Sequence, residues 1–468
     1  MQKEKDIMPD IILTHGYFLD EDPKEKEIMR PYPPLGILYV SGYLKTHGFS
    51  PEVFDSTFST RKKFEARLFS SGCKTLGIYT THMTRRSVVT QIKAAKKLDY
   101  TIVVGGPDSA GYPQQYLDQG ADFVVIGEGE ATLAELLPLL SSKNYALEDL
   151  KKIHGLIFKD QEGNFIETPM REYLDIDSLP WPDRESIDIR QYLDAWHSHH
   201  GETSLNMINS RGCRFHCRFC SHSVFGNTER RRLPENCAEE VEWIVKQYHP
   251  NQFWFSDDVF TMDHDWLIKF SEELKRRNVQ IRFEAISRAD RMQDDQIVKE
   301  LADMGCRRIW IGSESGSDRI LRAMRRGVTS DQITRAVKLS KKYGIETGIF
   351  LMWGYEGETL EDIELTVDHV IKSQPDIFLT TTVHPIRNTP FYYDIVDKVT
   401  HPESWVDSTD KDIGIKDRKP PEFYKAVDQW LKNAVKAEQN KIKFPEESAK
   451  FEQAAQEAKQ RVQVFFNG

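Results

Sequence analysis

The chain has 468 residues, of which 39% are hydrophobic and 11% aromatic, and its formal net charge is -10. This length predicts two or three domains, each large enough to bury a core, and the composition is typical of a soluble protein. The acidic balance argues against a broad nucleic-acid surface, which needs a basic face, and no apolar run approaches the ~18 residues that span a membrane.

The first residues, 1–6, are charged and lead directly into a short strand-like run, so this stretch lacks the apolar core of a secretory signal. The six cysteines include three isolated ones, Cys73, Cys237 and Cys306, which is unlike the dense framework of a small disulfide-bonded protein. We therefore expect a cytoplasmic protein, because a reducing compartment keeps thiols free.

Residues 1–145 alternate short β-branched or aliphatic runs with helix-like stretches. The predicted strands are Ile11–Thr14, Glu52–Phe54, Leu76–Thr80, Thr101–Gly105 and Asp122–Ile126. The predicted helices are Leu35–Thr46, Lys62–Phe69, Val88–Lys97 and Pro113–Leu117, and another opens near Ala131. This α/β alternation predicts a doubly wound, flavodoxin- or Rossmann-like parallel sheet, on which ligands bind outside the carboxyl ends of the strands.

Glycine-rich turns follow the last two of these strands. They read Gly105-Gly106-Pro107 and Gly127-Glu128-Gly129-Glu130. Glycine in such turns permits close backbone approach to a ligand, or tight packing. Gly105, Gly106, Gly127 and Glu128 are therefore candidate cofactor-binding residues.

Residues 146–200 are predicted to be a linker region, with a hairpin around residues 159–163 and a rigid, proline-rich bridge at residues 179–183.

From residue 201 the alternation of strands and helices resumes. The predicted strands are Leu205–Asn209, Phe253–Ser256, Ile281–Ala285, Arg308–Gly312, Thr347–Met352 and Ile377–Thr382. Six units of roughly 30 residues predict a partial (β/α)6 TIM-like barrel over residues 201–400, since a complete barrel needs about 250 residues.

Residues 401–468 are predicted to form a C-terminal helical extension. Pro420-Pro421 precede a charged helical stretch, and Pro445 separates it from a second helix over Glu446–Val462. Two amphipathic helices of this kind could form a lid, dock another subunit or simply pack on the barrel.

Three cysteines follow the first predicted barrel strand, with the spacing C-x3-C-x2-C: Cys213, Cys217 and Cys220. Three thiolates within eight residues can hold a four-iron cluster and leave one iron open, because cubane clusters usually take four cysteines. A Cys3His zinc site with His216 or His222 is the alternative, although structural zinc sites normally draw their ligands as separated pairs. No other cysteine group is visible for a second cluster.

Polar residues follow later barrel strands and would meet at the same carboxyl edge. They are Ser256-Asp257-Asp258, Ser287-Arg288 and Gly312-Ser313-Glu314-Ser315-Gly316. A carboxylate can accept hydrogen bonds from an ammonium group, and a guanidinium can bind a carboxylate. Alternatively, the aspartates could cap the next helix and Arg288 could form a surface ion pair.

Two basic runs, residues 230–232 and 325–326, could meet an acidic substrate or redox partner. Solvated surface charge is the simpler interpretation of both runs.

The cysteine spacing, with Phe219 just before the last cysteine, resembles the signature of the radical S-adenosylmethionine (SAM) superfamily. The resemblance implies that the three cysteines hold a 4Fe-4S cluster, that SAM completes it, and that one electron cleaves SAM to a 5'-deoxyadenosyl radical. It implies cofactor contacts from Phe219 in the cysteine loop and from the strand ends. The contacts at the strand ends are Ser256, Asp257 and Asp258 for the amino group, Arg288 for the carboxylate, Ser313 and Glu314 for the ribose, and Met352 and Gly354 for the adenine.

The later motifs depart from the family pattern at two turns. Tyr355-Glu356 replaces the usual Leu-Pro, and Asn388 replaces the glycine of a Gly-Thr-Pro segment, although Asn also tolerates a left-handed backbone. Trp353, His384 and Arg387 are candidate substrate contacts, or they serve packing.

The N-terminal half resembles the cobalamin-binding domain of one radical SAM class, through Pro33-Pro34-Leu35-Gly36 and the two glycine-rich turns. The D-x-H-x-x-G sequence that supplies an axial histidine in many cobalamin domains is absent, and His15 and His82 lack its Asp and Gly. The resemblance implies cobalamin without a histidine ligand. A flavodoxin-like domain that binds no cobalamin is the alternative.

Taken together, the resemblance implies a cobalamin-dependent methyltransferase that acts on an unactivated carbon. Its partners would be a small-molecule substrate and a flavodoxin- or ferredoxin-type electron donor. An oxidative cyclase or rearrangement enzyme without methyl transfer is the first alternative, and a non-catalytic zinc-binding module is the second.

Overall fold

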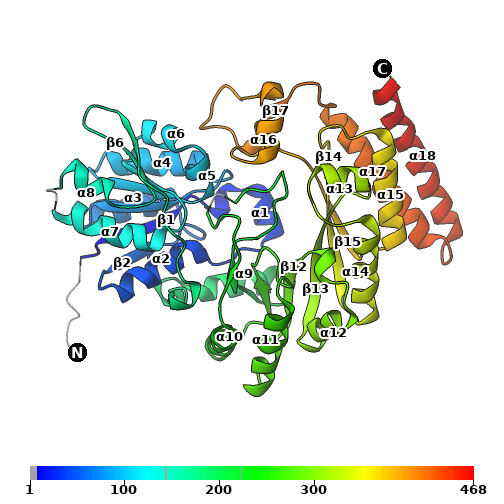
Figure 1. Cartoon of the computed structure of the whole chain (residues 1–468), viewed down its shortest axis with the longest axis horizontal. Coiled ribbons are helices and arrows are strands. Elements are labelled where there is room, and N and C mark those ends of the chain that lie inside the picture. The colour runs from blue at the N-terminus through cyan, green and yellow to red at the C-terminus, as the bar shows by residue number, and fades with distance from the viewer. Residues whose placement is uncertain (1–7, 143–144, 223, 468) are drawn as a thin grey trace. The chain divides into compact units, whose positions relative to one another are not determined.

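The computed structural model describes residues 8–142, 145–222 and 224–467 (Figure 1). The charged start at residues 1–6 lies outside the described residues. By its internal contacts, the chain forms two compact units. Unit 1 comprises residues 1–214, 222–253 and 401–412, and unit 2 comprises residues 215–221, 254–400 and 413–468. The predicted boundaries at residues 145, 200 and 400 do not coincide with the edges of these units.

Unit 1 is built on a seven-stranded sheet with the order β2-β1-β3-β4-β5-β6-β7. The strands are β1 (Ile11–His15), β2 (Pro51–Phe54), β3 (Thr75–Tyr79), β4 (Thr101–Gly105), β5 (Phe123–Val125), β6 (Leu156–Lys159) and β7 (Phe165–Glu167). β1 to β5 are parallel, as predicted, and β6 and β7 add an antiparallel hairpin. Residues 146–200 are therefore more than a linker, because their hairpin extends this sheet.

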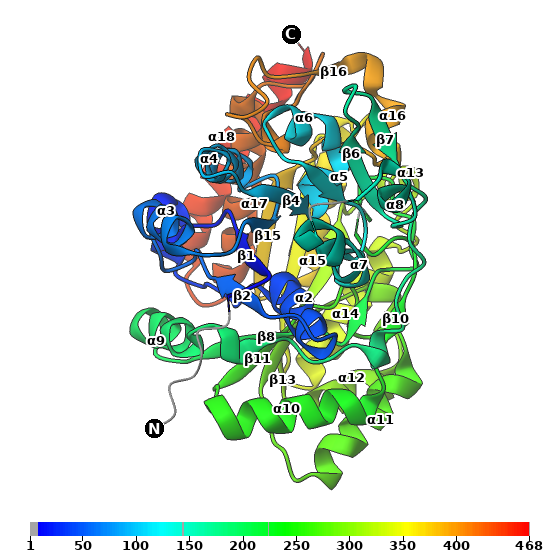
Figure 2. The same ribbon diagram turned by 90° about the vertical axis from the view of Figure 1, so that its left-hand side faces the viewer.

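Helices cover both faces of this sheet (Figure 2). Alternate strand residues point to opposite faces, so Ile12 packs on one side and Ile11 on the other. The first side carries α3 (Arg61–Ser70), α4 (Arg85–Lys96) and α6 (Pro113–Asp118), and the second carries α2 (Leu35–Thr46), α7 (Gly129–Ser142) and α8 (Leu147–Lys151). The sheet is thus doubly wound, and its carboxyl edge stays open for a ligand.

The remaining elements of unit 1 are short or lie near its connections. They are α1 (Pro23–Ile28), α5 (Pro107–Gly111), α9 (Ile189–His200), β8 (Ser204–Met207), β9 (Ser210–Arg211), β10 (Arg230–Arg231) and α10 (Pro234–Tyr248).

A second sheet has six strands in the order β15-β14-β13-β12-β11-β8. Its later strands are β11 (Gln252–Phe255), β12 (Phe283–Ser287), β13 (Cys306–Glu314), β14 (Glu346–Trp353) and β15 (Ile377–Thr382), and the boundary between the units falls inside β11. The helices are α11 (His264–Arg276), α12 (Asp295–Asp303), α13 (Asp318–Ala323), α14 (Ser330–Lys342) and α15 (Leu360–Ser373). The strands follow chain order, and β12 to β15 are parallel, as expected for a partial barrel.

Unit 2 ends in α16 (Pro390–Asp394), the short strands β16 (Val399–Thr400) and β17 (Gly414–Ile415), α17 (Pro421–Asn440) and α18 (Pro445–Asn467). α17 packs against both α18 and α15. Its Asp428 accepts a hydrogen bond from the Trp353 indole N–H at 2.9 Å. The predicted helical pair therefore packs on the barrel.

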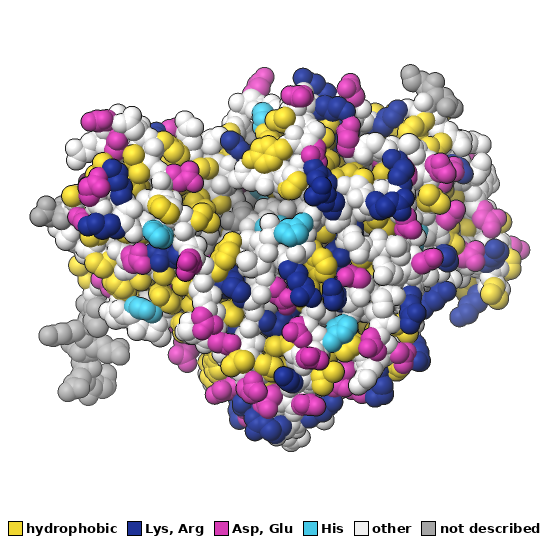
Figure 3. Space-filling view, viewed as in Figure 1, with side chains coloured by type: hydrophobic (Ala, Val, Ile, Leu, Met, Phe, Trp, Pro, Cys, Tyr) yellow, Lys and Arg dark blue, Asp and Glu magenta, His cyan; other side chains and the backbone are white. Residues whose placement is uncertain are grey.

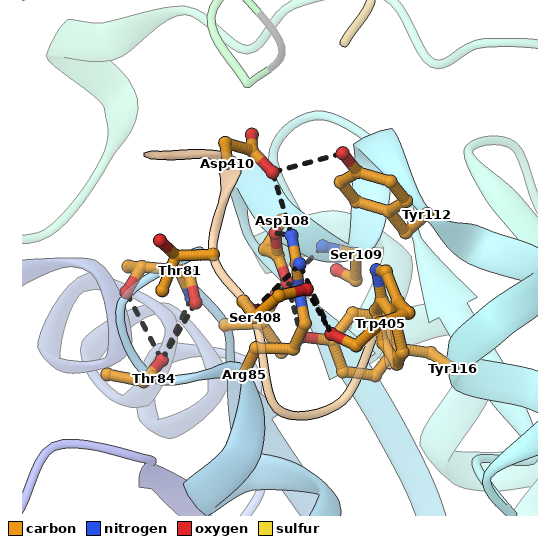
Figure 4. A network of polar contacts seen from close by, with 12 residues as sticks. Thr81, Thr84, Arg85, Asp108, Ser109, Tyr112, Tyr116, Trp405, Ser408 and Asp410 are labelled. Atoms are coloured by element: carbon orange, nitrogen blue, oxygen red, sulfur yellow. Dashed lines mark hydrogen bonds and ion pairs between the residues drawn. The ribbon is translucent and has the colours of Figure 1, made fainter. Parts of the chain in front are cut away.

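Residues 401–412, here called the return segment, belong to unit 1 although they follow the barrel. Arg85 on α4 is 2% exposed and pairs with Asp108 at 2.7 Å and with Asp410 of the return segment at 2.9 Å (Figure 4). Arg85 also donates to the Ser408 carbonyl oxygen at 3.0 Å. The prediction of a helical extension beginning at residue 401 is wrong for these twelve residues.

Aromatic side chains enclose this ion pair. The Tyr112 hydroxyl donates to Asp410 at 3.0 Å, and the Tyr116 hydroxyl donates to Asp108 at 2.6 Å. The Arg85 guanidinium lies 4.8 Å from the Trp405 ring and 4.5 Å from the Tyr112 ring. A buried charge needs such complete pairing, so the return segment is a structural part of unit 1.

The surface carries mixed charge. On the face shown in Figure 3, basic and acidic side chains are interspersed. Among the described residues, no helix combines the length and the apolar character that crossing a membrane requires.

Candidate functional site

Unit 1 contains a cavity of about 210 Å³ at the carboxyl ends of β1, β3, β4 and β5. All four residues that the sequence predicted for this edge line it: Gly105, Gly106, Gly127 and Glu128. The start of α2, the start of α7 and residues 208, 211, 224 and 225 complete its wall. The glycine-rich turns thus converge on one site, as the crevice rule for open α/β sheets predicts.

The glycines shape this cavity. Gly106 has φ +107°, and an added Cβ would lie 2.6 Å from the Thr80 carbonyl oxygen and 2.9 Å from the Tyr79 ring. A Cβ on Gly36 would lie 3.6 Å from the same ring. Glycine at Gly106 is therefore required both by backbone conformation and by space.

The charged groups of the cavity wall bind one another. Arg211 donates to Glu128 and to Glu130, each at 2.6 Å, and Arg230 reaches Glu128 at 3.0 Å. Burial lowers the pKa of Arg211, but the charges of Glu130 and Glu128 outweigh burial and raise it. Glu128 also accepts from the Leu174 N–H at 2.9 Å, so its carboxylate is committed to the protein.

The basic run at residues 230–232 is not a solvated surface, contrary to the sequence-based interpretation. Arg230 belongs to the ion pairs of the cavity wall, and Arg232 is 2% exposed and pairs with Glu240. Glu128 lies 102 residues from Arg230 in the sequence, and Glu240 lies eight residues from Arg232 on α10, so neither partner is part of the run that indicated surface charge.

No histidine is among the described residues that line the cavity. His15 has both ring nitrogens engaged, because Nε2 lies 3.0 Å from Asp55 and Nδ1 accepts from the Tyr17 N–H at 3.2 Å. Burial lowers the pKa of His82, which also lies outside the wall. Apolar side chains such as Leu13, Val103 and Val125 instead suit a flat, largely apolar macrocycle held without a histidine.

The cysteine loop is anchored in unit 2 at Arg218. The Arg218 N–H donates to the Met324 carbonyl at 2.9 Å, and its carbonyl accepts from the Phe391 N–H at 2.8 Å. Cys217 is buried and Cys220 is exposed, while Cys213, in unit 1, is partly exposed. Among the described residues, no three His, Cys, Asp or Glu side chains are gathered as a metal site.

Two buried guanidinium groups flank Cys217. Nη1 of Arg288 lies 3.8 Å from its sulfur, and Nη1 of Arg326 lies 3.9 Å away. Arg288 pairs with Asp290 at 2.9 Å and stacks 3.5 Å from the Phe215 ring. Thiolate ligands of an iron–sulfur cluster are anionic, so this positive surround fits such a group.

Arg326 was missed as a functional residue, because residues 325–326 were interpreted as solvated charge. Arg325 takes a left-handed conformation, φ +50°, just after α13. Arg326 then turns inward, donates to the Gly312 carbonyl at 3.0 Å and lies 3.5 Å from Glu314. Arg288 is likewise 2% exposed, so the surface ion-pair alternative for it is wrong.

Glu314 ends β13 and is 9% exposed, with the unusual φ of +61°. Burial raises its pKa, although Arg326 and Arg288 oppose this effect. Ser313 differs from the prediction, because its hydroxyl lies 3.3 Å from Nε2 of His369 on α15 and is fully buried. Its side chain is therefore buried against α15.

The three polar residues that follow β11 differ in how far they are exposed to solvent. Asp257 is 1% exposed, whereas Ser256 is partly exposed and Asp258 is exposed. Desolvation by the surrounding protein and the charge of Asp257 raise the pKa of Asp258. The helix-capping alternative is wrong, since Asp263 caps α11 by accepting from the Trp266 N–H at 3.0 Å.

At the end of β14, Met352 and Phe219 pack on one apolar cluster with Tyr355 and Phe391. Phe219 therefore supports the cysteine loop through packing. Trp353 is 1% exposed, so its proposed substrate contact is wrong. His384 and Arg387 are partly exposed, and Asn388 has φ +67°, which confirms the expected left-handed turn.

Gly354 also has a positive φ, +74°, and its N–H donates to Glu358 at 2.7 Å. Burial raises the pKa of Glu358 to about 8. The turn after β14 thus holds a carboxyl group that is protonated near neutral pH.

Two family matches cover separate parts of the chain. Residues 207–370 match the radical SAM superfamily, and residues 27–137 match the B12 binding domain. An uncharacterized methyltransferase of Pyrococcus horikoshii is 29% identical over 388 residues, which cover 80% of this chain and 81% of the relative. An anaerobic magnesium-protoporphyrin IX monomethyl ester cyclase of Rubrivivax gelatinosus is 25% identical over 80% of this chain and 68% of its own length.

Solved structures share the fold. The cobalamin-dependent SAM radical enzyme OxsB, with aqua-cobalamin bound, aligns with a TM-score of 0.75 and 17% identity over 97% of this chain and 71% of its own. The radical SAM methyltransferase TsrM from Kitasatospora setae aligns with a TM-score of 0.68 and 18% identity over 84% of this chain and 76% of its own. The two matched domain types use a 4Fe-4S cluster, SAM and cobalamin. The chain therefore carries a radical SAM domain preceded by a B12-binding domain.

Proposed function

We propose that this radical SAM enzyme is a cobalamin-dependent methyltransferase that acts on an unactivated carbon of a small molecule. The observation that carries the proposal is the apolar, glycine-lined cavity of unit 1, which lies at the carboxyl edge where a B12-binding sheet holds its ligand. The name of the Pyrococcus horikoshii relative adds support.

When bound, the cluster with SAM supplies a primary carbon radical, and cobalamin supplies a methyl group. In this proposal, Cys213, Cys217 and Cys220 hold the cluster through their thiolates. Arg288 and Arg326 offset the negative charge around Cys217, from which their Nη1 atoms lie 3.8 and 3.9 Å. Both guanidinium groups are buried, so water does not compete with Cys217 for these contacts.

The strand ends would orient SAM in unit 2. Asp257 and Asp258 present carboxylates that can accept from its ammonium group, and Glu314 can accept from ribose hydroxyls. Gly354 offers a backbone without a side chain at the end of β14. A flavodoxin- or ferredoxin-type donor in the cytoplasm would supply the electron.

An oxidative cyclase or rearrangement reaction is the second candidate. Relatives from Rubrivivax gelatinosus and Synechocystis, 25% and 27% identical, carry the name of a cyclase of magnesium-protoporphyrin IX monomethyl ester. The radical SAM match leaves no ground for the non-catalytic zinc module.

Product analysis separates the two enzyme reactions. Anaerobic protein is loaded with iron and sulfide, supplied with SAM and dithionite, and incubated with an anaerobic small-molecule extract, with and without hydroxocobalamin. S-adenosylhomocysteine formed together with 5'-deoxyadenosine, only when cobalamin is added, supports methyl transfer. 5'-Deoxyadenosine alone, at a rate that cobalamin does not change, supports the cyclase and overturns the methyltransferase.

A further inference from the structure

One polar group in the unit 1 cavity has no partner. Tyr79, the last residue of β3, lines the cavity and is partly exposed. Its hydroxyl forms no hydrogen bond with any residue in the described part of the chain. A phenol usually finds a partner when it is enclosed, so this unpaired hydroxyl shows that the Tyr79 side chain is not held by a polar contact within the described protein.

The other polar side chains of the wall are engaged. Glu128 and Glu130 accept from Arg211, and the Tyr39 hydroxyl donates to the Ile208 carbonyl at 3.4 Å. One nitrogen of Arg211, Nε, lacks a hydrogen bond, but it is fully enclosed. The Arg211 guanidinium also lies 4.9 Å from the Tyr39 ring, so protein groups contact it on more than one side.

Tyr79 ends β3, one of the four strands whose residues line the cavity. β3 lies between β1 and β4, and Tyr79 is in register with His15 on one side and Gly105 on the other. Gly36 and Gly106 leave room for its ring, since a Cβ on either would lie 3.6 Å or 2.9 Å from ring atoms. The fold therefore packs this aromatic ring against two glycines at the cavity edge.

We propose that the Tyr79 ring lies against the cobalt on the face of cobalamin turned toward the unit 1 sheet, and that it leaves this face without a protein ligand. The inference rests on the cobalamin of the proposed function and adds a role for one residue of this chain. It explains why the cavity wall needs no histidine: the ring fills the space that an axial ligand would occupy.

The chemistry of the phenol agrees with this role. Metal ligands bind in their deprotonated form, and burial raises the pKa of Tyr79, so its hydroxyl stays neutral at physiological pH. His15 cannot substitute, because both of its ring nitrogens are engaged within the sheet edge. Tyr79 is thus a positioning residue that sets the coordination of the metal.

Electron paramagnetic resonance of bound cob(II)alamin tests the proposal. Wild-type protein, titrated with hydroxocobalamin and reduced, should show no nitrogen splitting on its cobalt lines. Tyr79→His should introduce splitting that changes from three lines to two when the protein is labelled with 15N-histidine. Tyr39→His is the matched control, since this residue also lines the cavity but its hydroxyl is held at Ile208, and it should show no splitting.

The inference is overturned if Tyr79→His binds cobalamin without label-dependent splitting, or if Tyr39→His shows as much splitting. Tyr79→Phe should bind within about threefold of wild type, since no hydrogen bond worth ~1 kcal/mol is lost; a 100-fold loss contradicts the role. If Tyr79→His does not fold, Tyr79→Ala with added 15N-imidazole should show the splitting, and its absence there also overturns the inference. Failure of wild-type protein to bind cobalamin instead contradicts the proposed function.

Discussion

The two cofactor regions handle charge in opposite ways. In the unit 1 cavity, Arg211 is balanced by Glu128 and Glu130, and the remaining wall is largely apolar. In unit 2, Arg288 and Arg326 both lie within 4 Å of the Cys217 sulfur, and burial works against ionisation of the nearby Glu314 by raising its pKa. A large apolar ring is held by shape, whereas an anionic cluster is held by countercharge, so different substitutions should disable each region.

Loss of a cluster ligand should have the largest effect. Cys217→Ala removes one of three proposed thiolates, and we expect 5'-deoxyadenosine formation to fall by more than about 1,000-fold, since the cluster that delivers the electron is lost. Iron content and product formation after anaerobic reconstitution measure this. Cys237→Ala, which removes a buried thiol outside the cysteine loop, should keep both the iron content and product formation; full activity of Cys217→Ala would refute the ligand assignment.

The second prediction concerns the positive charge of Arg326 beside the Cys217 sulfur. Arg326→Gln keeps a polar side chain but removes the charge beside Cys217, and charged hydrogen bonds contribute about 1.5–3 kcal/mol, so SAM cleavage should slow by about 10- to 100-fold. Dithionite-driven 5'-deoxyadenosine formation at equal iron content provides the measurement. The exposed neighbour supplies the control, as Arg325→Gln should stay within about twofold of wild type. Equal rates for the two variants contradict a countercharge role.

The shape of the cavity is tested at Gly106, which has the least room for a Cβ among the glycines that line it. Gly106→Ala places a Cβ 2.6 Å from a backbone oxygen at φ +107°, a strain of about 1–3 kcal/mol. We expect hydroxocobalamin affinity to fall by about 10-fold, measured by absorbance titration. Gly111→Ala, where a Cβ meets nothing within 4 Å, is the matched control and should bind normally. Similar affinities would show that the turn does not shape the site.

A further prediction concerns stability rather than cofactor binding, and it depends on pH. The pKa of Glu358 is raised to about 8 in the folded protein from 4.5, so its stability contribution is full below pH 4.5 and is lost as the pH rises through 8. The loss is at most about 1.4 kcal/mol per pH unit. Glu358→Gln, which resembles the protonated carboxyl, should abolish it in urea unfolding between pH 6 and 8. Exposed Glu361→Gln should retain the wild-type slope; an unchanged slope in Glu358→Gln would mean that the carboxyl is already ionised.

Sequence patterns predicted the parts of the fold that depend on neighbours in the chain. The alternation of strand and helix patterns predicted both sheets, and the glycine-rich turns predicted one wall of the cavity. Both predictions succeed because backbone conformation and periodicity are local properties of the sequence. Arg211 could not be placed in the same way, since its partners Glu128 and Glu130 are 83 and 81 residues away. Arg326 was misread for the same reason, because burial is decided by the whole fold.

The return segment has a consequence for how such proteins can be recombined in evolution or in the laboratory. Asp410 and Ser408 complete the surroundings of Arg85, so the B12-binding region is not one continuous stretch of gene. A chain that ends at residue 400 would leave a buried cation with only part of its compensation, and breaking a buried pair costs about 3–5 kcal/mol. Exchange of this domain between enzymes must therefore carry twelve residues from beyond the barrel, or replace Arg85 with an uncharged side chain.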